Sequence, residues 1–352
     1  MTKKSAPNWL GYIGLALGVL LIGYLVSQFE LEKAWERICS IGYLSVVILL
    51  PFLCLHVVET YSWLQLFPGK NHKISFVKLL KIQIISETVS MTIPAGMPIG
   101  ESLRPFLCRR YMDIPVPTAV ASVAVRKLML GAIQGLYTLI GAIAGFSFLQ
   151  SVSTLMIGFE GLGFILAGSG IVVFAAFMLF ILLLLNGEAA QKIHGFLMLI
   201  PFRKVKDRLL EMESGFHETD QELKVIREMS PGKLVMVMLY YLVAWFMLAT
   251  ESYIILRLLG VDITFFQVLS IDTALSMLRA VFFFIPSGLG VQEIGYLAFF
   301  RVLGIQDAVI AGEAFVLVRR FKEIIWYSFG YLIMFLSGVR LRDAEQVRIV
   351  ES

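Results

Sequence analysis

The sequence predicts an all-α polytopic membrane protein built from two related halves, and three observations lead to this fold class. Of the 352 residues, 58% are hydrophobic and 16% are charged, whereas about 45–50% and about 25% are usual in soluble domains. The mean hydropathy is +0.81. Several apolar runs reach the roughly 20 residues that a spanning helix needs, and two of them contain similar Pro/Gly-rich interruptions. A soluble domain is therefore excluded.

The two interruptions repeat one another in register. The first reads IPAGMPIGE over residues 93–101, and the second reads IPSGLGVQE over residues 285–293, an offset of 192. Proline and glycine break helices, so each segment is expected to unwind a helix inside the membrane. The expected helix-breaking residues are Pro94, Gly96, Pro98, Gly100, Pro286, Gly288 and Gly290. Breaks at corresponding positions of two halves indicate a transporter binding site.

The repeat is wider than the breaks. At the offset of 192, Glu59 falls on Glu251, and each is followed by a hydroxyl residue and a tyrosine. At an offset of 193, Arg126 falls on Arg319. Leucines align by chance in any two apolar stretches, but an ordered set of carboxylates, proline, glycine and arginine does not. The pattern indicates an internal duplication.

We expect about six full transmembrane helices and two re-entrant broken-helix pairs. The full spans are expected at residues 9–27, 43–67, 116–146, 162–185, 230–259 and 307–339. The segment 100–111 after the first break covers roughly 18 Å as a helix, too short for a core of about 30 Å, and 291–303 is its counterpart. The expected division is a first transmembrane helix with an external segment (1–42), inverted repeat 1 (43–149), a linker helix with a cytoplasmic amphipathic hairpin (150–232), inverted repeat 2 (233–342) and a cytoplasmic tail (343–352).

The basic residues predict the orientation. With re-entrant pairs, 20 Lys and Arg residues face the cytoplasm and four face outside, as the positive-inside rule requires. A chain that crossed the membrane at each break would expose the basic stretches 104–110 and 192–233 outside. The two repeats are therefore expected to be inverted relative to each other, in a multi-pass protein of the cell (inner) membrane with both termini cytoplasmic.

Charged residues within the apolar segments are the candidate substrate-binding or coupling residues, because intramembrane charges are costly and usually functional. They are Glu59, Glu87, Glu101, Arg126, Glu251, Arg279, Glu293 and Arg319. Glu101 and Glu293 lie in the first turns of the half-helices, where each either caps its own helix or relays a proton or cation. The half-helix N-termini also provide N–H groups and a positive dipole end for an anion such as a phosphate.

Arg126 and Arg319 lie about ten to thirteen residues into their spans, too deep to reach the surface easily. Each is expected to pair with the glutamate of its own half, Glu101 or Glu293. That pair is either permanent and structural, or it opens so that the guanidinium grips a lipid phosphate. Glu87 and Arg279 occupy equivalent positions with opposite charge, and near a pseudo-two-fold axis they are candidates for a pair.

No catalytic, metal-binding or cofactor-binding motif is found, so an enzyme is not indicated and no cofactor or metal is expected. The sequence contains no Walker loop, HExxH or CxxC pattern and no pair of DxxD motifs. The three cysteines are far apart and fit no disulfide framework or zinc site. The basic residues in 203–208 suit an anionic-lipid contact rather than a nucleic acid.

Two parts of the sequence carry a family resemblance. The pattern Pro94-x-Gly96-x-x-x-x-Glu101-x-x-Arg104-Pro105, and the second break with its Glu293, resemble the membrane region of lysylphosphatidylglycerol synthases. The resemblance covers nearly the whole chain. It implies a stand-alone, flippase-like member that moves lipids with polar head groups between leaflets. The chain ends at Ser352 without the synthase domain, so the resemblance does not extend to lysyl transfer.

The leading functional prediction is a lipid flippase-like transporter for a polar or anionic, phosphate-bearing lipid. One alternative is an integral-membrane transferase that acts on a lipid-linked head group, which needs a nucleophile or a metal that the sequence does not reveal. Another is a scaffold for a separate lipid-modifying enzyme. The expected partners are membrane lipids, above all anionic ones, and either further copies of the chain or a lipid-synthesis enzyme. No nucleic acid is expected.

The topology is testable by cysteine labelling. In a chain whose three native cysteines are replaced, a cysteine in place of Ser151 or Gln306 should react with a membrane-impermeant thiol reagent in intact cells. A cysteine in place of Glu218 should react only after the cells are opened. Labelling at position 218 from outside would contradict the inverted arrangement.

Overall fold

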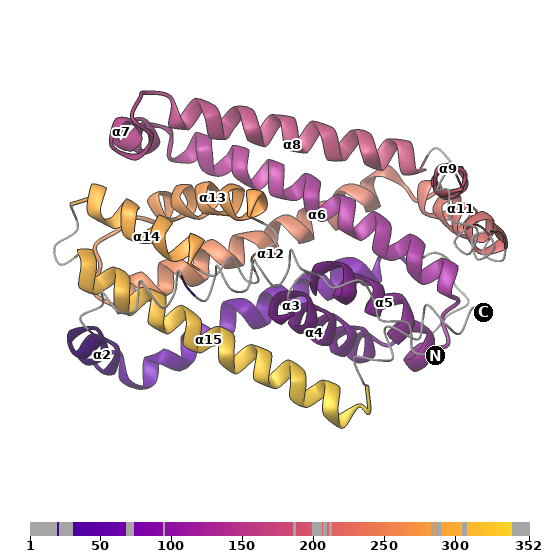
Figure 1. Cartoon of the computed structure of the whole chain (residues 1–352), viewed down its shortest axis with the longest axis horizontal. Helices are drawn as coiled ribbons and strands as arrows, with labels where there is room; N and C mark the ends of the chain where they lie inside the picture. The colour runs from indigo at the N-terminus through magenta and orange to yellow at the C-terminus, as the bar shows by residue number, and fades with distance from the viewer. Residues whose placement is uncertain are drawn as a thin grey trace.

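A computed structural model gives the fold of residues 31–67, 74–93, 96–185, 188–198, 213–282, 290–304 and 308–339, with the single residues 20, 206, 210 and 285. Within these ranges every regular element is helical and none is a strand, which confirms the all-α class. Thirteen α-helices and one 3-10 helix are described there (Figure 1). The first span expected at 9–27 falls almost entirely outside the described residues.

Four described helices are long and apolar enough to cross a membrane. They are η1 with α3 (Gly42–Ile48 and Leu49–Leu64), α6 (Val116–Ala144), α8 (Leu162–Leu185) and α12 (Pro231–Leu258). The helix α15 (Ala308–Leu336) is as long as α6. It is not one of these four helices, and its middle contains Arg319, Arg320, Lys322 and Glu323. Four of the six expected spans are therefore supported by length and composition.

The remaining helices are shorter. They are α2 (Leu31–Cys39), α4 (Phe76–Thr92), α5 (Gly96–Met112), α7 (Phe146–Ile157), α9 (Ala189–Leu197), α11 (Glu213–Arg227), α13 (Phe265–Val281) and α14 (Val291–Val302). The helix α12 starts as the sequence indicates, since the Ser230 side chain accepts the N–H of Lys233 and Pro231 occupies the first turn, where its missing N–H costs no hydrogen bond.

Helices α4 and α5 form an antiparallel hairpin across the first break. Near the break, a Cβ on Gly100 would lie 2.0 Å from the Ser90 hydroxyl oxygen and 2.4 Å from the Ser86 carbonyl oxygen, so only glycine allows this approach. At the other end, Lys78 Nζ donates to the Tyr111 carbonyl at 2.8 Å.

Helices α13 and α14 form a second antiparallel hairpin across the second break. A Cβ on Gly295 would lie 2.2 Å from the side chain of Leu275, and Tyr296 donates to Asp272 further from the break. Both breaks therefore turn the chain back upon itself.

The first break is shorter than predicted. Gly96, Pro98 and Gly100 were expected to be unwound, but they form the first turns of α5. The physical reason is that the first N–H groups of a helix have no intrahelical acceptor, so Pro98 removes no hydrogen bond there. Pro94 lies outside the described residues, as do Pro286 and Gly288, whereas Gly290 directly precedes α14 with a positive φ of 82°.

The two halves pack on each other reciprocally. The order α3, α4, α5, α6 recurs as α12, α13, α14, α15. Helix α6 packs on α13 of the other half, where a Cβ on Gly141 would lie 2.4 Å from Thr273. Helix α15 packs on α4, where a Cβ on Gly330 would lie 1.9 Å from Thr88. The hairpins lie toward opposite ends of the long axis (Figure 1).

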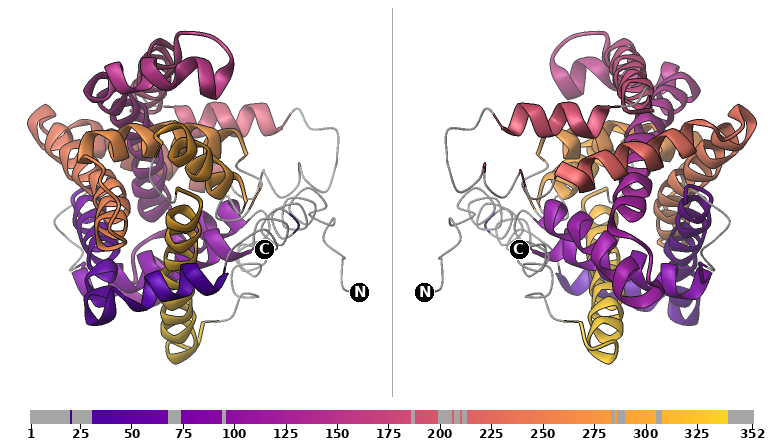
Figure 2. Two further views of the ribbon diagram at one scale, coloured as in Figure 1. Left: turned by 90° about the vertical axis from the view of Figure 1, so that its left-hand side faces the viewer. Right: turned by 90° about the vertical axis from the view of Figure 1, so that its right-hand side faces the viewer.

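Two peripheral parts mark the ends of the molecule. Helix α7 runs crosswise to α6 and α8 at one end, and α9 and α11 lie at the other (Figures 1 and 2). The Asp220 carboxylate on α11 accepts the N–H groups of Ala190 and Gln191 at the start of α9, at 2.8 and 3.0 Å. Thr118 donates to Glu222 at 2.9 Å, so this helix pair is fastened to α6.

Helices α6 and α8 approach closely through glycines, as membrane helices commonly do. A Cβ on Gly170 would lie 2.8 Å from backbone atoms of Gly135 and of Leu139, whereas a Cβ on Gly168 meets nothing within 4 Å.

We therefore expect Gly170→Ala to destabilise the protein by about 1–3 kcal/mol, because the added methyl group separates the two backbones. The control Gly168→Ala makes the same change two residues earlier in α8 and should not destabilise it. Thermal unfolding in detergent, followed by size-exclusion chromatography, measures both. Equal melting temperatures for the two variants would contradict the close packing.

Candidate functional site

Charged side chains, most of them buried or partly buried, gather in two clusters, one in each half. The first cluster lies among α3, α4, α5 and α6, and its Lys127 is half-exposed. It comprises Glu59, Glu87, Glu101, Arg104, Arg126 and Lys127, with Gln83. Each cation in this cluster lies within 4 Å of a carboxylate oxygen, as buried charges require.

Arg126 occupies the middle of the first cluster, and only 1% of its side chain is exposed. Its Nη2 donates to Glu59 at 2.9 Å and to Gln83 Oε1 at 3.1 Å. Its Nη1 lies 3.8 Å from Glu101 Oε2, within ion-pair reach but too far for a hydrogen bond. Its strongest partner is therefore Glu59, and the pairing with Glu101 that the sequence suggested is the looser one.

Arg104 is a central residue that the sequence analysis misplaced. It was counted among the cytoplasmic bases, but its side chain is fully buried. Its Nε donates to Glu101 at 3.0 Å, its Nη2 lies 3.4 Å from Glu87, and it also donates to Gln83. The available signal was the three-residue spacing from Glu101, which puts both side chains on one face of a helix.

The second cluster lies mainly on α15, with contributions from α12, α13 and α14. It comprises Glu251, Glu293, Arg319, Arg320, Lys322 and Glu323, with Asp272 and Tyr296. Glu293 pairs with Arg320 rather than with Arg319. At the repeat offsets, this pair corresponds to Glu101 with Lys127, which lie 3.1 Å apart. The same contact thus recurs in both halves.

Arg319 has two carboxylate partners, one of them through a tyrosine. Its Nε lies 4.0 Å from Glu323 Oε1. Its Nη1 donates to the Tyr296 hydroxyl at 3.0 Å, and that hydroxyl donates to Asp272 at 3.1 Å. The other Asp272 oxygen accepts the Tyr137 hydroxyl of α6 at 2.7 Å. The sequence analysis missed Asp272, although an aspartate inside an apolar helix was a visible signal.

Glu251 is bound by Lys322, whose Nζ lies 2.8 and 3.0 Å from its two oxygens. Both side chains are at most 5% exposed. Lys322 Nζ also lies 4.2 Å from the centre of the Phe52 ring on α3, a cation–π contact. One turn along α3, His56 packs against Trp326 of α15. These contacts join the helices that carry the two clusters.

The expected pair of Glu87 with Arg279 does not form in the described residues. Glu87 pairs with Arg104, and Arg279 lies half-buried on α13. Opposite charges at equivalent positions were therefore not enough to predict an ion pair, because Arg104 binds the Glu87 carboxylate instead.

Several buried polar atoms in and between the clusters have no hydrogen-bond partner within the described residues. They are Nε and Nη1 of Arg126, Nε of Arg319, Oε2 of Glu293, Nδ1 of His56 and Nε1 of Trp326. An unused buried donor is costly, so these atoms mark a place where a ligand improves the hydrogen bonding. Within the same residues, no three His, Cys, Asp or Glu side chains are arranged to hold a metal ion.

Comparison with known proteins identifies related chains. Residues 11–325 match the family described as the lysylphosphatidylglycerol synthase TM region. A UPF0104 membrane protein of Pyrococcus horikoshii is 22% identical over 302 residues, which cover 85% of this chain and 89% of that protein. With the apolar helices described above, these matches identify a multi-pass membrane protein.

Arg126 and Lys127 provide a matched test of burial. We expect Arg126→Met to destabilise the protein by about 3–5 kcal/mol, because Glu59 loses its nearest cation while it stays largely buried. Lys127→Met removes a half-exposed cation from the same helix and should change stability by about 1 kcal/mol or less. Thermal unfolding of both variants in one detergent measures the difference. A similar loss of stability in both variants would show that the burial of the cation does not determine the cost of removing it.

Proposed function

The chain belongs to the family of the lysylphosphatidylglycerol synthase TM region, and from that premise we propose that it is a flippase-like transporter of polar or anionic lipids. In this proposal it moves a phosphate-bearing lipid between the two leaflets and carries out no chemical reaction. The proposal rests on the buried guanidinium of Arg126, whose donor groups are only partly used.

The proposed architecture consists of two inverted repeats, α3–α6 and α12–α15. Three observations support it: each half contains an antiparallel hairpin at its break, the fourth helix of each half packs on the hairpin of the other, and the hairpins lie toward opposite ends. In a membrane such hairpins are re-entrant pairs, and the positive-inside rule assigns α9, α11 and both termini to the cytoplasm. Inverted repeats around a central site are the usual architecture of alternating access.

The proposed cargo site lies in the first cluster, at Nη1 of Arg126, which has no hydrogen-bond partner within the described residues. A guanidinium N–H forms a charge-assisted hydrogen bond with a phosphate oxygen. Glu101 is the carboxylate that a phosphate displaces from Nη1, since it lies 3.8 Å from Arg126 but 3.0 and 3.1 Å from Arg104 and Lys127. A phosphate that replaces Glu101 beside Arg126 leaves Glu101 with two cations. While the phosphate is bound, Glu59 and Gln83 keep their hydrogen bonds with Nη2 of Arg126.

The second cluster offers a weaker anion site. The buried Nε of Arg319 has no hydrogen-bond partner within the described residues but lies 4.0 Å from Glu323, and its Nη1 donates to Tyr296. Glu293 is held by Arg320, which also binds Glu323. We therefore assign phosphate binding to the first cluster and a positioning role to the second.

Leaflet exchange in liposomes tests the proposal. Vesicles carry fluorescent phosphatidylglycerol in both leaflets, and an impermeant reductant destroys only the fluorescence that reaches the outer leaflet. The protein should raise the destroyed fraction above the outer-leaflet share. Arg126→Lys should slow exchange about tenfold or more, because lysine keeps the charge but its single ammonium lacks the separate nitrogens with which the guanidinium can hold Glu59 and Gln83 and still bind the phosphate. The control Arg257→Lys makes the same change at an exposed pair with Asp262 and should leave exchange unchanged.

A neutral fluorescent glycolipid, which has no phosphate, tests whether the site selects an anion. If the protein exchanges this lipid as fast as phosphatidylglycerol, the site does not select a phosphate, and the anion site is wrong. If neither lipid is exchanged by correctly folded protein, the transport function itself is wrong.

A further inference from the structure

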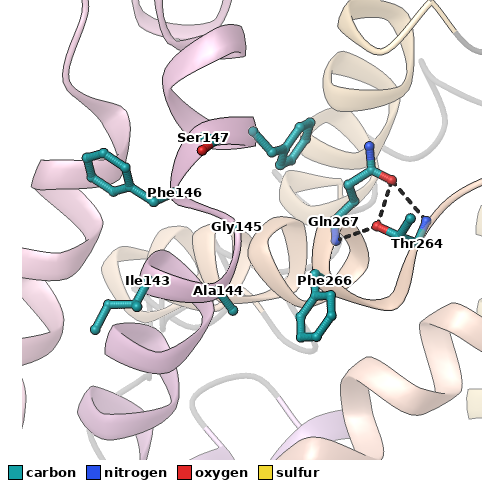
Figure 3. A pocket seen from close by; sticks show the side chains of 9 residues that line it. Ile143, Ala144, Gly145, Phe146, Ser147, Thr264, Phe266 and Gln267 are labelled. Atoms are coloured by element: carbon teal, nitrogen blue, oxygen red, sulfur yellow. Dashed lines mark hydrogen bonds between the residues drawn. The ribbon is translucent and has the colours of Figure 1, made fainter.

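A cavity of about 310 Å³ lies outside both clusters, at the corner where α6 ends and α7 and α13 begin. It is lined by residues 143–148 and by Thr264, Phe266 and Gln267 (Figure 3). Its volume is at the lower end of the range for small-molecule sites. None of its lining residues belongs to the candidate site described above.

The lining combines neutral hydrogen-bonding groups with apolar side chains. Ser147, Thr264 and Gln267 are polar, and no charged side chain lines the cavity. Thr264 and Gln267 bind each other in a capping box, in which the Gln267 side chain uses its oxygen as acceptor. Within the described residues its amide nitrogen has no partner. Ile143 and Phe266 are 64% and 60% exposed. Such a lining suits an uncharged polar group that is attached to a hydrocarbon chain.

The position in the fold indicates where that group comes from. Two candidate membrane helices meet at this corner, since α6 ends at Ala144 and α8 begins at Leu162. Between them α7 lies crosswise over their ends (Figure 1). The ends of spanning helices lie at the bilayer boundary, which is the depth of the glycerol and ester groups of phospholipids. The molecules that surround the cavity are therefore lipids.

At the equivalent helix end in the other half, two side chains bind the terminal carbonyl groups. Gly338 corresponds to Gly145 at the offset of 193, and its carbonyl accepts Arg110 Nη2 at 3.0 Å. The Tyr111 hydroxyl donates to the neighbouring Ser337 carbonyl at 3.3 Å. These side chains come from the end of α5 and cover the end of α15.

The open corner, where the cavity lies, lacks these two side chains. At the offset of 192, Arg110 and Tyr111 are replaced by Val302 and Leu303, whose aliphatic side chains cannot donate hydrogen bonds. Only Ser270 of α13 is described as donating a side-chain hydrogen bond to a carbonyl at this end of α6, that of Gly141, at 3.0 Å. The two helix ends thus differ in the side chains that lie over them.

We propose that the open corner binds the glycerol–ester region of one bilayer phospholipid. Its ester oxygens accept from the Gln267 amide and the Ser147 hydroxyl, and an acyl chain runs along Ile143 and Phe266. This inference rests on the proposed function, because it identifies where a cargo lipid is held at the end of the protein opposite α9 and α11.

Photo-crosslinking tests the site by binding alone. The photoreactive amino acid p-benzoylphenylalanine replaces Phe266 or, as a control, Phe180, which is 53% exposed on α8 and outside the cavity. The purified full chain in dodecyl maltoside is titrated with dioleoylphosphatidylglycerol and irradiated. The lipid adduct should saturate at position 266 and rise linearly at position 180. A diether lipid that lacks ester carbonyl groups should need a higher concentration at position 266.

A second variant fills the cavity. Ser147→Trp should reduce the adduct at position 266 about tenfold, a loss of about 1.4 kcal/mol. Leu155→Trp adds the same side chain to an exposed position of α7 outside the cavity and should change nothing. A linear titration at position 266, or an adduct that Ser147→Trp does not reduce, overturns the proposal.

The outcomes separate the two proposals. Saturable crosslinking without leaflet exchange supports the lipid site and contradicts only the transport function. Leaflet exchange with a linear titration at position 266 supports transport and contradicts only the lipid site. Thermal unfolding of each tryptophan variant confirms that the compared proteins are folded.

Discussion

The cost of burying charge in a membrane is the constraint on which the rest of the structure depends. The free-energy cost of a charged side chain at the centre of a bilayer is offset only if opposite charges and hydrogen bonds surround it. Here the partners of each arginine come from several helices, so Arg126 joins α6 to α3 and α4. Arg104 joins α5 to α4. The charges therefore fix how the hairpin lies against the spanning helices, which van der Waals packing of apolar side chains alone does not specify.

The two halves share a backbone order but differ in chemistry. Arg104 in the first cluster corresponds to Tyr296 in the second, and Gln83 corresponds to Leu275. As a result Arg126 donates directly to a carboxylate, whereas Arg319 donates to a neutral hydroxyl that binds Asp272 and lies 4.0 Å from Glu323. The two halves have one ion pair in common, which is Glu101 with Lys127 in the first and Glu293 with Arg320 in the second. The two halves thus share one ion pair and differ in the groups around the arginine to which we assign phosphate binding.

The sequence predicts the helical class and most helix bounds, because apolar length and Pro/Gly breaks are local signals. The start of α12 at Ser230 and Pro231 is one example. Pairing partners were harder to predict, because they depend on how helices rotate against each other. Glu293 had two adjacent arginines within reach, and only packing selects Arg320. Arg104 was counted with the cytoplasmic bases because positive charge near a loop is usually solvated. The re-entrant pair was expected from the Pro/Gly break, but its burial of Arg104 depends on how α5 packs on α4. The cavity at Gly145 depends on two distant segments, so no local pattern reveals it.

Helix α6 passes every one of these regions without interruption. Its 29 residues cover about 43 Å as a helix, from Thr118 beside α11, past Arg126 and Tyr137, to Ile143 at the cavity. A rigid rod cannot turn at one end alone. If α6 rotates so that Arg126 leaves Glu59, the same rotation shifts Tyr137 against Asp272 and moves the wall of the cavity. Events at the two membrane surfaces are thereby mechanically linked through a single helix.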